Sequence, residues 1–123
     1  MQTSYRLTTI LLAVPTLLAC GVAEGMSAVP ARADNFAYLV NVTVRPGYNF
    51  ASAENALAYG HGICDHVAQG RSYTDVLGDI KNDFGTSDDY QASYLVNQAV
   101  NELCPAQIWQ LRNSAATYRP PNP

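Results

Sequence analysis

The 123-residue chain is poor in basic residues, and those it has are scattered. Seven lysines and arginines stand against ten aspartates and glutamates, and from Asp34 onward five basic and nine acidic residues give a formal charge of −4. Proteins that bind a phosphate backbone depend on clustered positive charge. The sequence therefore predicts no nucleic-acid partner, and its length allows for a single domain.

Long hydrophobic runs are lacking as well. The apolar stretch near the N-terminus covers residues 7–19, which is shorter than the roughly 20 residues that a transmembrane helix needs. With Arg6 in front of it, this stretch has the charged start and short apolar core of an export signal. We therefore expect the protein to be secreted or held in the cell envelope, with no transmembrane span in its mature chain.

Two cleavage sites compete at the end of this signal. The favoured site is the A-x-A sequence that ends at Ala33, which makes residues 1–33 the export signal and Asp34 the first mature residue. The alternative is the lipobox-like sequence LLAC at residues 17–20, in which Cys20 would carry a lipid anchor.

Between residues 52 and 105, apolar residues recur with the period of a helix in three segments. Each segment begins at a residue that can cap a helix and ends at a glycine or a proline. The three expected helices lie within residues 52–70, 72–85 and 86–105, with Ser52, Ser72 and Thr86 as their N-caps.

Residues 35–44 fit two patterns. Apolar residues at helical spacing favour a short helix capped by Asp34, yet alternating β-branched and aromatic residues are also typical of a strand. The helix is the favoured interpretation, and the strand stays open. The helical set is Phe36, Leu39, Val40 and Thr43, and the alternating set is Phe36, Tyr38, Val40, Val42 and Val44.

These segments predict an all-α domain over residues 34–112, a compact array of about four helices stapled by one disulfide. The apolar sequence PAQIWQL near its end is expected to fold Ile108 and Trp109 onto the core. The proline-rich residues 113–123 are expected to form a disordered tail.

The heptapeptide GHGICDH, residues 60–66, combines two histidines, a cysteine and an aspartate. On a helix, His61 and His66 point about 140° apart, so they cannot share one metal ion, and Cys64 lies far from the helix N-terminus that would activate it. The export signal instead favours a disulfide between Cys64 and Cys104. Gly60, one turn before Cys64, would allow the helices to approach closely enough for the sulfurs to meet.

The segments GHGICDHVAQGRSYTDVLGDI and LVNQAVNELCP, with the A-x-A-D junction before the domain, resemble the mycobacterial exported family known as domain of unknown function 732. The matching positions are Gly60, Ile63, Cys64, Cys104 and Pro105. The resemblance implies a small helical domain with one disulfide, exported to the cell envelope or beyond. It implies no activity.

Three aspartates, Asp75, Asp79 and Asp83, recur every four residues along the third expected segment. The ligand pattern of an EF-hand calcium loop is missing. We interpret these carboxylates as a solvated acidic face and predict no metal site and no cofactor.

No spacing of catalytic residues, glycine-rich phosphate loop or nucleophile elbow is recognisable, so a non-enzymatic module with an unknown envelope or extracellular partner is expected. Tyrosine and asparagine suit contact surfaces, and four such residues lie opposite the apolar stripe of the last long segment. This candidate interaction face consists of Tyr90, Tyr94, Asn97 and Asn101. The alternative function is a carrier of a small apolar ligand, such as a lipid, in a pocket between helices.

Overall fold

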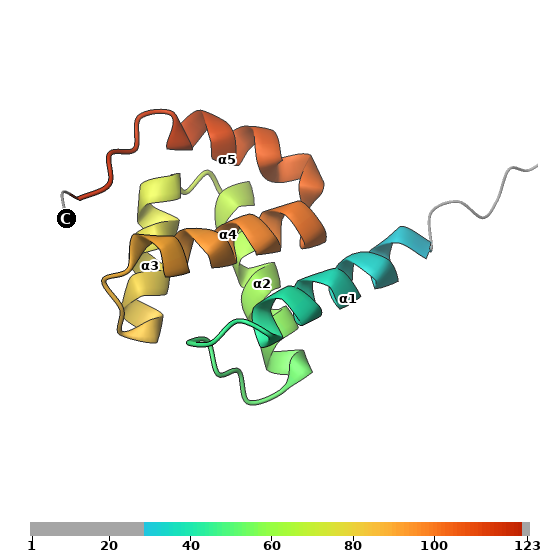
Figure 1. Cartoon of the computed structure of the whole chain (residues 1–123). Coiled ribbons are helices and arrows are strands. Elements are labelled where there is room, and N and C mark those ends of the chain that lie inside the picture. Colours follow the sequence, from blue (N-terminus) through green and yellow to red (C-terminus); the bar gives the residue numbers. More distant parts are fainter. Residues whose placement is uncertain (1–28, 122–123) are drawn as a thin grey trace, which may run out of the picture.

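The computed structural model describes residues 29–121, and within this range the regular secondary structure is helical throughout, as predicted (Figure 1). The elements are α1 (Val29–Thr43), α2 (Ala53–Ala68), α3 (Tyr73–Phe84), α4 (Asp89–Leu103), the 3-10 turn η1 (Pro105–Gln107) and α5 (Ile108–Ala115). Helix α4 is central and packs against α1, α2 and α3. No helix in the described part of the chain is both long and apolar enough to cross a membrane.

Local capping explains where α2 and α3 begin and end. The hydroxyl of Ser52 accepts a hydrogen bond from the Asn55 amide (3.0 Å), and that of Ser72 accepts one from the Asp75 amide (3.1 Å). Gly85 ends α3 in the left-handed conformation, with a φ of 59°, which glycine adopts without steric penalty. These predicted boundaries are confirmed.

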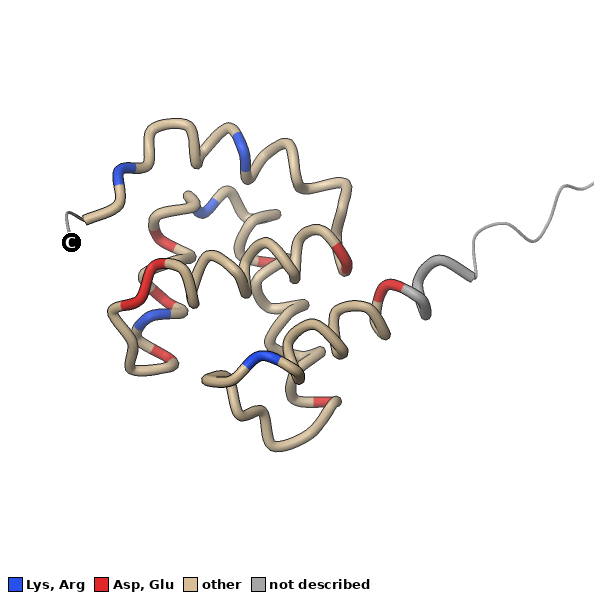
Figure 2. Tube along the Cα trace, in the orientation of Figure 1, with Lys and Arg blue, Asp and Glu red and all other residues tan. Residues whose placement is uncertain are grey.

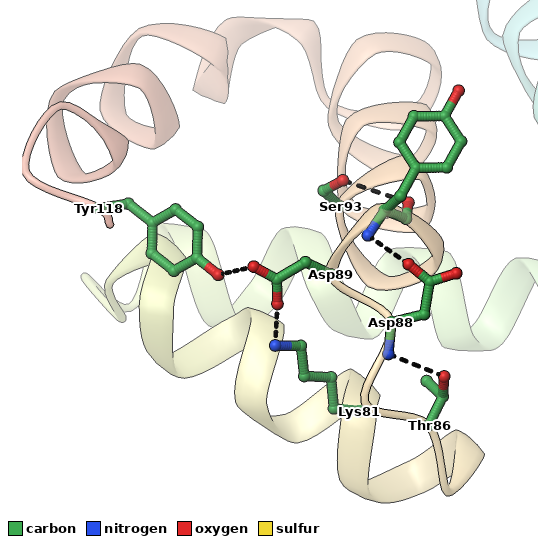
Figure 3. Close-up of polar contacts among 7 residues, drawn as sticks. Lys81, Thr86, Asp88, Asp89, Ser93 and Tyr118 are labelled. Atoms are coloured by element: carbon green, nitrogen blue, oxygen red, sulfur yellow. Dashed lines mark hydrogen bonds and ion pairs between the residues drawn. The ribbon is translucent and has the colours of Figure 1, made fainter. Parts of the chain in front are cut away.

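The start of α4 differs from the prediction. Asp88, not Thr86, is the N-cap, and its carboxylate accepts a hydrogen bond from the Tyr90 amide (2.9 Å). Thr86 instead accepts one from the Asp88 amide (Figure 3). Both residues can cap, and Asp88, two residues after Thr86, is the one whose side chain accepts a hydrogen bond from a free amide in the first turn of the helix.

Helix α4 forms the centre of the core. One side of it is completely shielded from solvent, and all five residues of this side are 0% exposed: Ala92, Leu95, Val96, Ala99 and Val100. From α1, Tyr38 is also 0% exposed, and its hydroxyl donates a hydrogen bond to the Ala56 carbonyl of α2 (3.0 Å). The polar end of this large side chain is therefore satisfied inside the core.

Gly60 makes room for two side chains from other helices. A Cβ at this position would lie 2.6 Å from Cδ1 of Leu103 and 2.7 Å from Cζ of Tyr38. The predicted close approach at Gly60 thus exists, and the groups that use it are the side chains of Tyr38 and Leu103.

The disulfide between Cys64 and Cys104 is confirmed, with their Cα atoms 6.1 Å apart. It ties the middle of α2 to the residue that ends α4. For a closed loop of this size, 40 residues apart in sequence, the chain-entropy model gives a stabilisation of about 4 kcal/mol.

Residues 35–44 are helical up to Thr43, so the favoured interpretation of this segment is correct. The helix begins earlier than expected, at Val29, and Asp34 therefore lies inside α1 and does not cap it. Pro30 falls in the first turn, where a helix tolerates proline. Residues 1–28, with Cys20 and most of the expected export signal, lie outside the described residues.

The C-terminal segment is more ordered than the sequence suggests. Helix α5 extends to Ala115, past the expected domain boundary at residue 112. Farther on, the Tyr118 ring packs edge-on against Tyr73 at 5.2 Å, and its hydroxyl donates to Asp89, which also pairs with Lys81 (Figure 3). A ring and a hydroxyl that both find partners hold this segment against the domain.

The two apolar residues at the start of α5 behave differently. Ile108 packs against the core as expected. Trp109 is 71% exposed, so the prediction that it folds inward is wrong. The next inward position of α5 is taken by Leu111, which is 6% exposed.

Candidate functional site

The outer side of α1, extended by Val44, whose amide still donates to the Val40 carbonyl (3.1 Å), carries three large apolar side chains. Phe36, Val40 and Val44 are 70%, 41% and 75% exposed. Because a helix advances about 100° per residue, these three fall within about 80° of one another. Tyr38 and Val42 lie on the opposite side, in the core. The apparent strand pattern of this segment therefore reflects a helix with apolar residues on both sides.

Charged groups are missing from this stretch of α1. Between Asp34 and Arg45 the sequence has none, and Figure 2 shows this part of the helix as an uncharged length with charges concentrated around α3 and the start of α4. A contiguous exposed apolar patch on a small protein is typical of a contact surface. The core alone does not account for these side chains.

The predicted face of α4 borders this stripe and is only partly free. Tyr90 is 64% exposed, and Asn97 and Asn101 are exposed as well. Tyr94 is half-buried, because its hydroxyl donates to the Asn41 carbonyl of α1 (3.3 Å). Tyr94 thus serves the packing of α1 on α4, as do the amides of Asn41 and Gln98, which are hydrogen bonded at 2.7 Å.

Arg45 joins the two helices at one end of their contact. Its guanidinium lies 4.1 Å from the centre of the Tyr94 ring and 4.7 Å from that of Tyr90, within the range of a cation–π interaction. The ring of Tyr90 is therefore held in place although most of its surface faces solvent.

The helical repeat places both exposed sets on the solvent side of the contact between α1 and α4. Asn41 of α1, which touches α4, lies between the buried side of α1 and the exposed stripe, and Tyr94 and Gln98 hold the same position on α4. Arg45, two residues after the end of α1, extends this contact. We call this combined surface the α1–α4 face. It consists of Phe36, Val40, Val44, Tyr90, Asn97 and Asn101.

A second candidate is a cleft of about 220 Å³ between α2 and α3. Its rim carries Tyr59, His66, Asp79 and Asp83. The floor is formed by Gly62 and the buried Ile63, Val76 and Ile80, and the exposed Ala58 also lines the cleft. Tyr59 donates a hydrogen bond to Asp83 (2.8 Å), and burial together with this bond raises the pKa of Tyr59, so its hydroxyl stays protonated.

One carboxylate of α3 makes ion pairs that the sequence did not predict. His61 is exposed, whereas Nδ1 of His66 lies 3.9 Å from Asp79, and Arg71 pairs with the same carboxylate at 2.6 Å. The carboxylates of α3 are therefore not a uniformly solvated face. Within residues 29–121 no group of three metal-binding side chains comes together.

The α1 stripe and the cleft were not predicted from the sequence. The signal for the stripe was present, since Phe36, Val40 and Val44 lie at i, i+4 and i+8 while Tyr38 and Val42 supply a second apolar set. The cleft gave no comparable signal, because it depends on how α2 and α3 face each other.

A family model described as protein of unknown function (DUF732) matches residues 32–106. This chain belongs to that family. The matched region contains both cysteines of the disulfide and the whole α1–α4 face, and it ends before α5. No curated protein matches the chain, and no solved structure matches it.

Proposed function

We propose that this member of the family is an exported, non-enzymatic interaction module that binds a protein partner through the α1–α4 face. The observation that carries the proposal is the exposed stripe of Phe36, Val40 and Val44. Phe36 and Val44 keep at least 70% of their surface in solvent and Val40 keeps 41%, and burying this surface on a partner would be favourable by about 25 cal/mol per Å² of apolar surface.

The remainder of the face has the composition of a contact surface. Tyr90 offers a large ring that Arg45 keeps in position, so little side-chain entropy is lost when a partner covers it. Asn97 and Asn101 offer amides that can donate and accept hydrogen bonds around the apolar stripe. An apolar centre with an uncharged polar border is typical of protein interfaces.

A non-enzymatic role is supported by the state of the thiols. Cys64 and Cys104 are consumed by the disulfide, so neither offers the thiolate that a cysteine nucleophile requires. His66 is 3.9 Å from Asp79, but Arg71 already neutralises this carboxylate at 2.6 Å. The pair therefore lacks the free carboxylate that would orient a histidine as a general base.

The alternative, a carrier of a small apolar ligand, is less well supported. The cleft between α2 and α3 is smaller than the roughly 300–1,000 Å³ of ordinary ligand pockets. Its rim carries two carboxylates, which do not suit the apolar body of a lipid.

The proposed location, outside the cell or in its envelope, is supported by the export signal expected within residues 1–33. Cleavage after Ala33 would start the mature chain at Asp34, inside α1 and ahead of Phe36, so the α1–α4 face is retained. Acylation at Cys20 would retain the same face.

Photo-crosslinking tests this proposal directly. A p-benzoylphenylalanine residue is introduced at Phe36, Val40 or Val44 in cells that make the protein naturally. The control position is Trp109 on α5, whose exposure of 71% matches that of Phe36 and Val44. We expect the three α1 positions to give one common cross-linked protein, identified by mass spectrometry. The same product from Trp109, or no discrete product from α1, contradicts the proposal.

A further inference from the structure

Two glycines within helices have no role in packing. Gly62 in α2 and Gly78 in α3 are both interior helix positions, and a Cβ on either would meet nothing within 4 Å. Glycine in a helix interior destabilises it by about 1 kcal/mol relative to alanine. Gly60 is explained by its contacts with Tyr38 and Leu103, but Gly62, two residues later, is not.

Gly62 differs from Gly78 because it forms part of the floor of the α2–α3 cleft. A side chain at Gly62 would fill the hollow that the glycine leaves open. Glycine is the usual residue where a ligand approaches the backbone closely. The unexplained glycine and the cleft therefore point to the same place.

The cleft combines an apolar floor with two carboxylates at its rim. The floor contains Ile63, Val76 and Ile80, and the rim contains Asp79 and Asp83. No lysine or arginine is among the described residues that line it. Arg71 pairs with Asp79, whereas Asp83 forms no ion pair with any of the described residues, so its carboxylate is open to a cationic ligand.

Asp83 is held in position by the wall of the cleft. It accepts the hydrogen bond of the Tyr59 hydroxyl (2.8 Å). The Tyr59 ring in turn packs edge-on against Phe84 at 5.3 Å and at a tilt against Phe50 at 5.7 Å. The carboxylate and the aromatic wall are thus fixed before any ligand arrives, which lowers the entropic cost of binding.

We infer that the α2–α3 cleft binds a small organic cation, a protonated amine on a short apolar body. The apolar body lies on the floor beside Gly62, and the ammonium group faces Asp83, with the Tyr59 ring beside it as a cation–π partner. The cleft volume of about 220 Å³ fits a body of one ring or a short alkyl chain. This site is separate from the α1–α4 face and does not depend on the function proposed for it.

Benzylammonium is the probe, and benzyl alcohol is its neutral counterpart of similar size. Titration of the purified protein, followed by amide chemical shifts, should show saturable shifts at Gly62, Ile63, Val76 and Ile80 with benzylammonium. Benzyl alcohol should bind about tenfold more weakly or worse, because it forms no charge-assisted hydrogen bond. Equal binding of both compounds, or no saturable shift with benzylammonium, overturns the inference.

Two variants with one matched control locate the site. Gly62→Leu fills the floor and should abolish binding, whereas Gly78→Leu makes the same change on α3 outside the cleft and should leave it intact. Asp83→Asn keeps an acceptor for Tyr59 but removes the charge, and it should weaken binding about tenfold.

Thermal melting shows that the variants are folded. Both leucine variants should melt a few degrees above the wild type, because each removes an interior helix glycine. Unchanged binding by a folded Gly62→Leu protein, or an equal loss in Gly78→Leu, overturns the inference.

Discussion

Helices α1 and α4 both bury one side in the core, and they differ in what they show to solvent. The inner side of α4 is 0% exposed from Ala92 to Val100, and its outer side presents Asn97 and Asn101. The inner side of α1 includes the equally buried Tyr38, yet its outer side presents Phe36, Val40 and Val44. Folding explains the two inner sides, and the outer sides, above all the apolar one of α1, need another explanation.

The largest expected effect separates the two sides of α1. Tyr38→Ala removes a ring that is 0% exposed and a hydrogen bond to Ala56, and it should lower the free energy of unfolding by about 3–5 kcal/mol. Phe36→Ala removes a similar ring that is 70% exposed, and it should change the free energy by no more than about 0.5 kcal/mol. Urea denaturation of both variants gives the comparison, and similar losses would contradict it.

Loss of the disulfide should have the next largest effect, and it acts on α2 and α4 without touching α1. Replacing Cys64 and Cys104 by serine together should cost about 2–4 kcal/mol of unfolding free energy, measured by thermal and urea denaturation. Alkylation of the unreduced wild-type protein should modify neither cysteine of the pair, by intact mass. Two reactive thiols in the folded protein would refute the bond.

Two glycines of α2 test how closely α1 packs against α2. Gly60→Ala brings a methyl group against Tyr38 and Leu103, and an overpacking penalty of about 1–3 kcal/mol should exceed the gain of about 1 kcal/mol in helix propensity. Gly62→Ala meets open space and should raise the melting temperature. Stabilisation by both substitutions would mean that α1 adapts easily at this contact.

Tyr48, in the loop between α1 and α2, is 4% exposed, and its hydroxyl donates a hydrogen bond to the Gln91 carbonyl of α4 (2.6 Å). Its burial makes this contact sensitive to alkali. Burial is the largest cause that raises the pKa of Tyr48 to about 12, whereas an unfolded tyrosine ionises near 10. Tyr48 therefore loses its proton first in the unfolded state. The stability that its protonated hydroxyl contributes to the fold is fully present below pH 10 and is lost as the pH rises from 10 to 12.

At pH 10.5 the loss of unfolding free energy caused by Tyr48 is expected to be below about 1 kcal/mol. Denaturation with urea between pH 8 and 11 measures it, and Tyr48→Phe should reduce the pH dependence. A pH dependence that is unchanged in Tyr48→Phe would show that other groups cause it.

Local signals account for the parts of the fold that could be predicted. Ser52 and Ser72 hydrogen bond within the first turn of their own helices, so their roles can be recognised from the sequence alone. The pairing of Cys64 with Cys104 followed because the chain, after the expected signal, contains no other cysteine. None of these inferences requires knowledge of how the helices pack.

The parts that could not be predicted depend on contacts between helices. The sequence places Trp109 in the core, but Leu111 takes the inward position on α5. Tyr94 has the pattern of a free surface residue until α1 is placed against it. The pairing of His66 with Asp79 and the cleft beside them exist only after α2 and α3 are packed together.

The most direct test of the α1–α4 face is the affinity of the cross-linked partner for the double variant Phe36→Ser/Val44→Ser. Both side chains are at least 70% exposed, so the variant should melt within a few degrees of the wild type. Loss of two apolar anchors should weaken binding by about 30-fold or more, while Trp109→Ser should bind like the wild type. Unchanged affinity of the folded double variant would contradict the account, and so would a large loss of its stability.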